Sequence, residues 1–175
     1  MIDGIWTLDT LMDEEQDKLA SAWHEAYPRR GQNGPADKPW GQLDETYRES
    51  NRAAADHLDI KLHSIGLERR PKAECGENEV KTLDPDQAEL LSKVEHARWC
   101  AERWLDGWRW GEEKDPKDKI HPDLVPWDKL PEAERKIDEV LVSQVFTALE
   151  SIGQGAVPIS DDNEMTMKRS LPAHS

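Results

Sequence analysis

The chain has 175 residues, a formal net charge of −14 and a pI near 4.8. This length suits one domain or two small halves that pack tightly together. The acidic balance argues against duplex nucleic acid and anionic membranes as partners, because both select a basic footprint. The eight tryptophans supply apolar surface for a core and flat faces for a ring-shaped ligand.

The cysteines and the apolar runs bear on where the protein works. Cys75 and Cys100 lack the spacing of a metal site or a redox motif. We find no signal peptide and no apolar run of membrane-spanning length. We therefore expect a cytoplasmic protein with reduced thiols, without a bound metal or cofactor.

Apolar residues at helical spacing predict two helices in the first part of the chain. The first begins near Asp13 and ends at Pro28, where a loop rich in Gly, Pro and Arg follows. The second runs from Asp44 to Gly66, a residue type that commonly ends helices. Residues 67–83 are charged, and we expect them to form a linker.

The third helix has the clearest start, because Asp84 is a good N-cap and Gln87 can complete a capping box. A second stripe on this helix, formed by His96, Trp99 and Arg103, is expected to touch more than solvent. The predicted core stripe consists of Leu90, Val94, Ala97, Ala101, Trp104 and Trp108.

The last part of the chain is predicted to hold a long loop, one more helix and a tail. Residues 111–130 form the loop, and we expect Trp108-Arg109-Trp110 to enter a short strand there. The fourth helix starts at Pro131 and ends at Gly153. We expect residues 154–175 to be a mobile tail.

A pattern of aromatic and turn residues occurs twice, and an arginine lies eight residues after the tryptophan in each copy. We therefore predict two halves, residues 1–66 and 84–153, packed about an approximate twofold axis with a ligand at their junction. The second copy reads His96-x-x-Trp99, Gly107-Trp108-x-x-Gly111, His121-Pro122 and Pro126-Trp127-x-x-Leu130, and the first reads His24-x-x-Tyr27 and Pro39-Trp40-x-x-Leu43.

The second copy resembles the RyR domain, the repeat named after ryanodine receptors and found also in bacterial and phage proteins. The first copy is similar to the region that accompanies this repeat in bacterial relatives. The resemblance implies a mainly α-helical module of two helix–loop–helix repeats with short β-strands. In ryanodine receptors adenine-nucleotide binding is associated with one repeat pair, which implies a ligand-sensing role for this chain.

A small anionic, nucleotide-like ligand needs aromatic platforms, guanidinium groups and directional hydrogen-bonding groups. Residues 48–72 carry six Lys or Arg against four acidic residues, which is compatible with such a ligand. The alternative is that Arg48 and Asn51 only hold the two halves together. The candidate ligand-binding residues are Trp40, Arg48, Asn51, Arg52, Asp56, His57, Trp99, Arg103, Trp110, His121 and Trp127.

The chain shows no P-loop, nucleophile elbow, dinucleotide fingerprint or zinc-protease motif, so we assign no catalytic residue. The acidic stretch at residues 111–118 lacks the spacing of a calcium loop. His96 is either a base or, as we favour, a group that holds a turn. We therefore predict a non-enzymatic binding module. The alternatives are an adaptor that binds a protein partner or forms a homo-oligomer, and a hydrolase acting on a nucleotide derivative.

Overall fold

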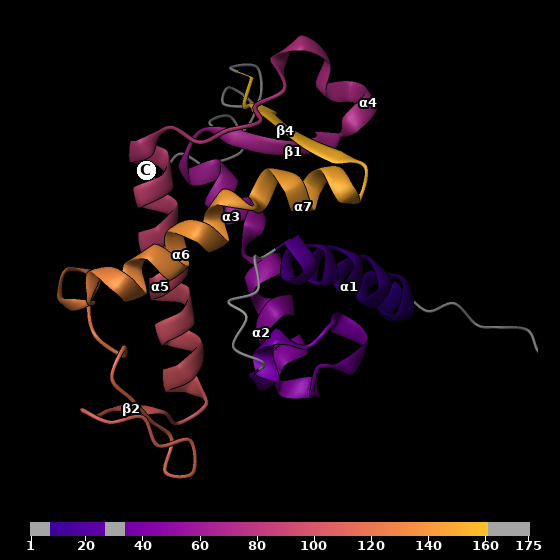
Figure 1. Ribbon diagram of the computed structural model, residues 1–175. Helices are drawn as coiled ribbons and strands as arrows, with labels where there is room; N and C mark the ends of the chain where they lie inside the picture. The colour runs from indigo at the N-terminus through magenta and orange to yellow at the C-terminus, as the bar shows by residue number, and fades with distance from the viewer. Residues whose placement is uncertain (1–7, 27–33, 161–175) are drawn as a thin grey trace, which may run out of the picture.

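The computed structural model describes residues 8–26 and 34–160, with side chains from residue 17 onward (Figure 1). The described fold is mainly helical and carries two small two-stranded sheets, which confirms the expected class. Its elements are α1 (Leu8–Ala26), η1 (Pro35–Asp37), η2 (Trp40–Gln42), α2 (Glu45–Asp56), α3 (Leu58–Ser64), β1 (Leu67–Pro71), α4 (Lys72–Cys75), η3 (Gly76–Asn78), α5 (Pro85–Leu105), β2 (Arg109–Trp110), β3 (Ile120–His121), η4 (Trp127–Lys129), α6 (Glu132–Ser143), α7 (Val145–Ser151) and β4 (Gln154–Pro158).

One hydrophobic core draws on both parts of the chain. Figure 1 shows α7 between the β1–β4 ribbon and α1. Leu58 and Leu62 of α3 and Leu149 of α7 are fully buried in this core, each worth about 1.5–3 kcal/mol of burial free energy. Because α1 and α3 pack with α7 in one cluster, the segments before residue 67 and after residue 84 stabilise each other.

One long helix was predicted after Trp40 and another after Trp127, and in the structure each of them is divided into two helices. The second predicted helix breaks at His57 into α2 and α3, and the fourth breaks at Gln144 into α6 and α7. Neither break has a glycine or proline, so residue propensity gave no sign of it. Gly66 and Gly153 follow the helix ends at the same φ of 75°, which confirms their predicted helix-ending role.

The series of 3-10 turn, helix, short helix and strand occurs twice. The elements η2, α2, α3 and β1 correspond in order to η4, α6, α7 and β4. Each element of the second series begins and ends 87 positions after its counterpart in the first. The contacts within the two series also correspond. The His24 ring nitrogen bonds the carbonyl of Lys38, and the His96 ring nitrogen bonds the carbonyl of Val125, which lies 87 positions after Lys38.

The β1–β4 ribbon is antiparallel and pairs Arg69 with Ala156 at its centre. Its strands occupy residues 67–71, at the start of the expected linker, and residues 154–158, at the start of the expected mobile tail. Leu67 and Ala156 are buried against the core, and this tertiary packing orders segments too short to show a clear period of two. In the other sheet, β2 spans Arg109–Trp110 and so confirms a short strand within the predicted Trp108–Trp110, without Trp108.

Helix α5 begins with the predicted capping box, but its predicted core stripe is wrong. Leu90 is 41% exposed and Trp104 is 57% exposed, so this stripe faces outward. The buried side is instead the one that carries Glu95, His96 and Cys100. The hydrophobic pattern predicted the wrong buried face of α5, because ion pairs and hydrogen bonds hold the inner face of this helix in place.

Candidate functional site

A cavity of about 480 Å³ lies between α2 on one side and α5 and α6 on the other, and we call it the seam cavity. Helices α2 and α6 each present four residues at spacing i, i+3, i+4 and i+7, which places them on one helix face. The lining residues are Tyr47, Ser50, Asn51 and Ala54 of α2; Glu134, Ile137, Asp138 and Leu141 of α6; Glu95, His96, Arg98 and Trp99 of α5; and Trp23, Ala36, Asp37, Lys114, His121, Asp123 and Leu130.

A buried ion pair joins α3 to α5 beside the seam cavity. Lys61 of α3 is 1% exposed and contacts Glu95 of α5, which is 2% exposed. Burial by itself raises the pKa of Glu95, but Lys61 and Arg98 outweigh burial, so this pKa lies below its ordinary value. Lys61 also donates to the carbonyl of Ala54 and lies over the ring of Trp23. The charge of Glu95 is therefore neutralised within the protein.

His96 uses both ring nitrogens. Its Nδ1 lies 3.5 Å from Asp138 Oδ2, and its Nε2 lies 2.8 Å from the carbonyl oxygen of Val125 and 3.5 Å from Cys100 Sγ. Burial lowers the pKa of His96, but these hydrogen bonds outweigh burial and raise it to about 10. The ring is an imidazolium that donates from both nitrogens at neutral pH, so it has no lone pair with which to act as a base.

Trp99 provides a flat aromatic wall. Its ring centroid lies 6.0 Å from that of His96 and 5.0 Å from that of His121, which meets it edge-on. Burial and the nearby Lys114 lower the pKa of His121, so this second imidazole is neutral at pH 7. The two histidines hold the indole in place beside the cavity.

Two groups of the lining that have no partner among the described residues bear on a ligand site. The indole N–H of Trp23 is buried and makes no hydrogen bond there. The carboxylate of Glu134 makes neither an ion pair nor a hydrogen bond with a described residue. A buried donor without a partner is costly, but this nitrogen has almost no surface exposed to the cavity, so a ligand seated there does not reach it.

Three of the candidate residues from the sequence come together in the seam cavity: Asn51, Trp99 and His121. The Asn51 amide donates to the carbonyl of Tyr47, which leaves its own carbonyl oxygen as an acceptor. These residues come from different parts of the chain, and α2, α5 and β3 position them.

Trp40, Arg48 and Arg52 form a separate cluster outside the cavity lining. Both guanidinium groups lie about 6 Å from the Trp40 ring centroid, at 6.0 Å for Arg48 and 5.9 Å for Arg52. Arg48 pairs with Glu45, and Arg52 pairs with Glu45 and Asp17. Each arginine expected to bind phosphate on α2 thus already has a carboxylate partner.

The other candidates are spread over both halves. Arg103 pairs with Glu102 and reaches Ser50 across the junction. Trp127 lies edge-on to His96. None of the remaining five lines the seam cavity: Asp56 and Trp110 are exposed, while His57, Arg103 and Trp127 are partly buried.

Sequence reasoning missed the acidic and aromatic remainder of the lining. Glu134 and Asp138 lie 87 positions after Tyr47 and Asn51, so extending the alignment of the two copies along the helix would have found them. Trp23 is one of the apolar residues at helical spacing in the first predicted helix, and nothing in the sequence marks its indole N–H as unsatisfied.

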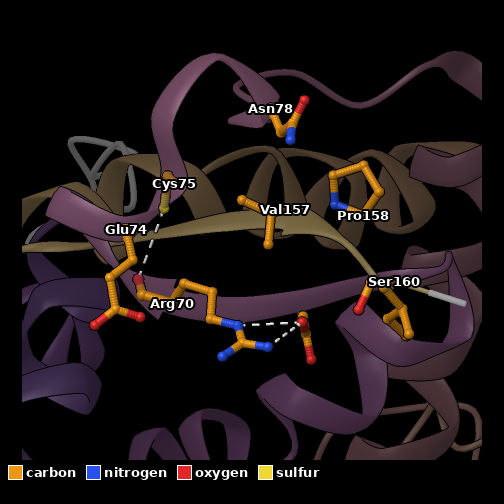
Figure 2. Close-up of a pocket in the computed structure, with 9 residues that line it drawn as sticks. Arg70, Glu74, Cys75, Asn78, Val157, Pro158 and Ser160 are labelled. Atoms are coloured by element: carbon orange, nitrogen blue, oxygen red, sulfur yellow. Dashed lines mark hydrogen bonds and ion pairs between the residues drawn. The ribbon is translucent and has the colours of Figure 1, made fainter. Parts of the chain in front are cut away.

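A second hollow, of about 510 Å³, lies over the β1–β4 ribbon (Figure 2). Arg70 extends across it and pairs with Glu68, while the Cys75 thiol points to the carbonyl of Arg70. This hollow has no aromatic side chain in its lining, and its arginine has a carboxylate partner. The seam cavity is therefore the stronger candidate site.

The described part of the chain contains no cluster of His, Cys, Asp or Glu suited to a metal ion. Within the same residues, no helix has the length and apolar character needed to cross a membrane.

Fold and site define a small, mainly helical protein with a ligand-sized cavity at the junction of α2 with α5 and α6. Residues 79–155 match the RyR domain family. This segment includes α5, α6 and α7 and therefore one side of the seam cavity. No curated protein matches the chain.

Proposed function

We propose that this protein is a non-enzymatic sensing module that binds a small nucleotide-like ligand in the seam cavity. The observation that carries the proposal is the cavity itself, about 480 Å³ in volume, with the Trp99 wall. This volume lies within the range of sites for small molecules. The base of the ligand stacks on Trp99, and Asn51 binds its polar edge.

A phosphate group on such a ligand lies outside the cavity in this proposal. Lys114 is at the exposed rim, whereas Arg48 and Arg52 are engaged by carboxylates. A buried phosphate would also meet the carboxylates of Asp138 and Glu134, which repel it. Affinity therefore comes mainly from the ring system of the ligand, and an anionic group lies at the rim without adding to it.

We also infer that the two series of elements are repeats related by an approximate twofold axis through the seam cavity. The proposal places the halves at residues 1–66 and 84–153, with residues 67–83 between them and residues 154–175 after them. Support comes from the constant spacing of 87 positions and from the ribbon, whose central pair, Arg69 and Ala156, is separated by that same spacing. The axis would pass between matching faces of α2 and α6.

Calorimetric titration with ATP, ADP-ribose and cyclic nucleotides tests the binding proposal. We expect binding of at least one of them, and loss of about tenfold or more in affinity for Trp99→Ala, since stacking is worth about 1–3 kcal/mol. Trp110→Ala is the matched control, because Trp110 is exposed and lies outside the cavity. Absence of binding throughout, or equal effects of both variants, would refute the proposal.

An adaptor function is the second candidate, and the outer face of α5 favours it. Leu90, Trp104 and Leu105 are 41%, 57% and 90% exposed, an unusual set of apolar groups for one helix. Light scattering would reveal a homo-oligomer, and Trp104→Ser should dissociate it. A hydrolase function has less support, because His96 lacks the free lone pair of a base.

A further inference from the structure

The charges around the seam cavity do not balance. The negative charge of Glu95 is neutralised by Lys61 and Arg98, and the negative charge of Asp138 is neutralised by the His96 imidazolium. The remaining lining carboxylates, Asp37, Asp123 and Glu134, face a single lysine, Lys114.

These three carboxylates differ in how they are engaged. Asp37 accepts the backbone N–H of Gly34 at 2.9 Å, and Asp123 lies 3.6 Å from the Nδ1 of the neutral His121. Glu134 is the one with no partner among the described residues. It lies in the first turn of α6, so the helix position fixes it at the cavity while both of its oxygens stay open to accept.

A carboxylate with two free oxygens binds two adjacent N–H donors in a bidentate pair. Groups of this kind contain an N–C–N unit, either in an alkylguanidinium or in the edge of a guanine-type ring. Both are planar and stack on an indole face such as that of Trp99.

We propose that the seam cavity binds a guanidine-type group, with Glu134 as its bidentate acceptor and Trp99 as its stacking face. The inference rests on the proposed function, since it assigns the ligand chemistry of that same cavity. Both a guanine-type ring and an alkylguanidinium satisfy the carboxylate of Glu134. A phosphate on such a ligand weakens binding, because the cavity has an excess of negative charge.

Calorimetric titrations of the whole chain with four probes test this assignment: guanosine, inosine, guanosine 5′-monophosphate and agmatine. Inosine lacks only the amino group that completes the donor pair. We expect guanosine to bind about tenfold or more tighter than inosine, the usual effect of a hydrogen bond to a charged group. Guanosine should also bind more tightly than its monophosphate. Tighter binding of agmatine than of guanosine would identify an alkylguanidinium as the source of the group.

Glu134→Gln should abolish the difference between guanosine and inosine. Glu132→Gln is the matched control, because Glu132 is on the same first turn with its side chain 85% exposed and should leave the difference intact. Circular dichroism and thermal unfolding confirm that both variants fold. Equal affinity of the wild type for guanosine and inosine would overturn the assignment. An unchanged difference between the two ligands in Glu134→Gln would overturn it as well. Binding of ATP or ADP-ribose would then still support the proposed function, whereas no binding by any nucleoside or nucleotide would remove both.

Discussion

Replacing Glu95 with leucine should destabilise the protein strongly. The substitution leaves the ammonium group of Lys61, 1% exposed, without its carboxylate and with only the Ala54 carbonyl and the Trp23 ring as partners. Arg98 loses the same acceptor but still pairs with Glu102. Removal of one partner from a buried ion pair costs about 3–5 kcal/mol.

A loss of this size is a large share of the stability of a small protein, which is about 5–15 kcal/mol. For a chain of this length, each kcal/mol lowers Tm by about 2–4 °C, so Glu95→Leu should lower Tm by roughly 6–20 °C. Urea unfolding at pH 7, followed by circular dichroism, gives the free-energy difference directly. An unchanged m-value would show that the compactness of the two states is preserved.

Two comparisons make this prediction refutable. The surface pair of Lys93 and Glu89 is about half exposed, and Lys93→Ala should change the free energy of unfolding by about 0.5 kcal/mol or less. The double variant Lys61→Met/Glu95→Leu should recover most of the loss, because no unpaired charge remains. If Glu95→Leu costs no more than Lys93→Ala, or if the double variant is worse than the single one, the reasoning is wrong.

Two further predictions concern pH and backbone conformation. His96 has a folded pKa of about 10 against about 6.5 when unfolded, so its contribution is complete below pH 6.5 and is lost as the pH rises towards 10. Urea unfolding should show wild-type stability falling over that window by up to about 1.4 kcal/mol per pH unit, and His96→Gln should flatten the slope. Gly66→Ala and Gly153→Ala should each cost about 1 kcal/mol, because both residues have positive φ with no steric neighbour. Gly41→Ala, without positive φ, should cost less, and equal effects at all three would contradict the argument.

Local signals predicted the helical parts of the fold well. The cap at Asp84 and the glycines after α3 and α7 are short-range features, and the structure has them where the sequence places them. The helix breaks at His57 and Gln144 have no glycine or proline, so no local pattern marks them. The ribbon was missed because β1 is ordered by β4, which is distant in the sequence.

The candidate site was only partly predictable. The search for aromatic and amide groups selected Trp99 and Asn51, which line the cavity. The arginines selected to bind phosphate are instead paired with acidic neighbours, as Arg52 is with Asp17 and Glu45. Ion pairing between residues far apart cannot be read from composition. The inner face of α5 was misjudged because burial of Glu95 depends on Lys61, which lies on another helix.

The β1–β4 ribbon has a consequence for the order in which the chain folds during synthesis. Strand β1 ends at Pro71, but its partner ends only at Pro158, so β1 stays an unpaired edge while the intervening residues are made. Helix α1 likewise packs on α7, which emerges late. The first half therefore leaves the ribosome incomplete and exposes apolar surface until β4 arrives. Chains stopped before residue 154 should be aggregation-prone and sensitive to proteases, whereas chains that extend beyond residue 158 should resist them.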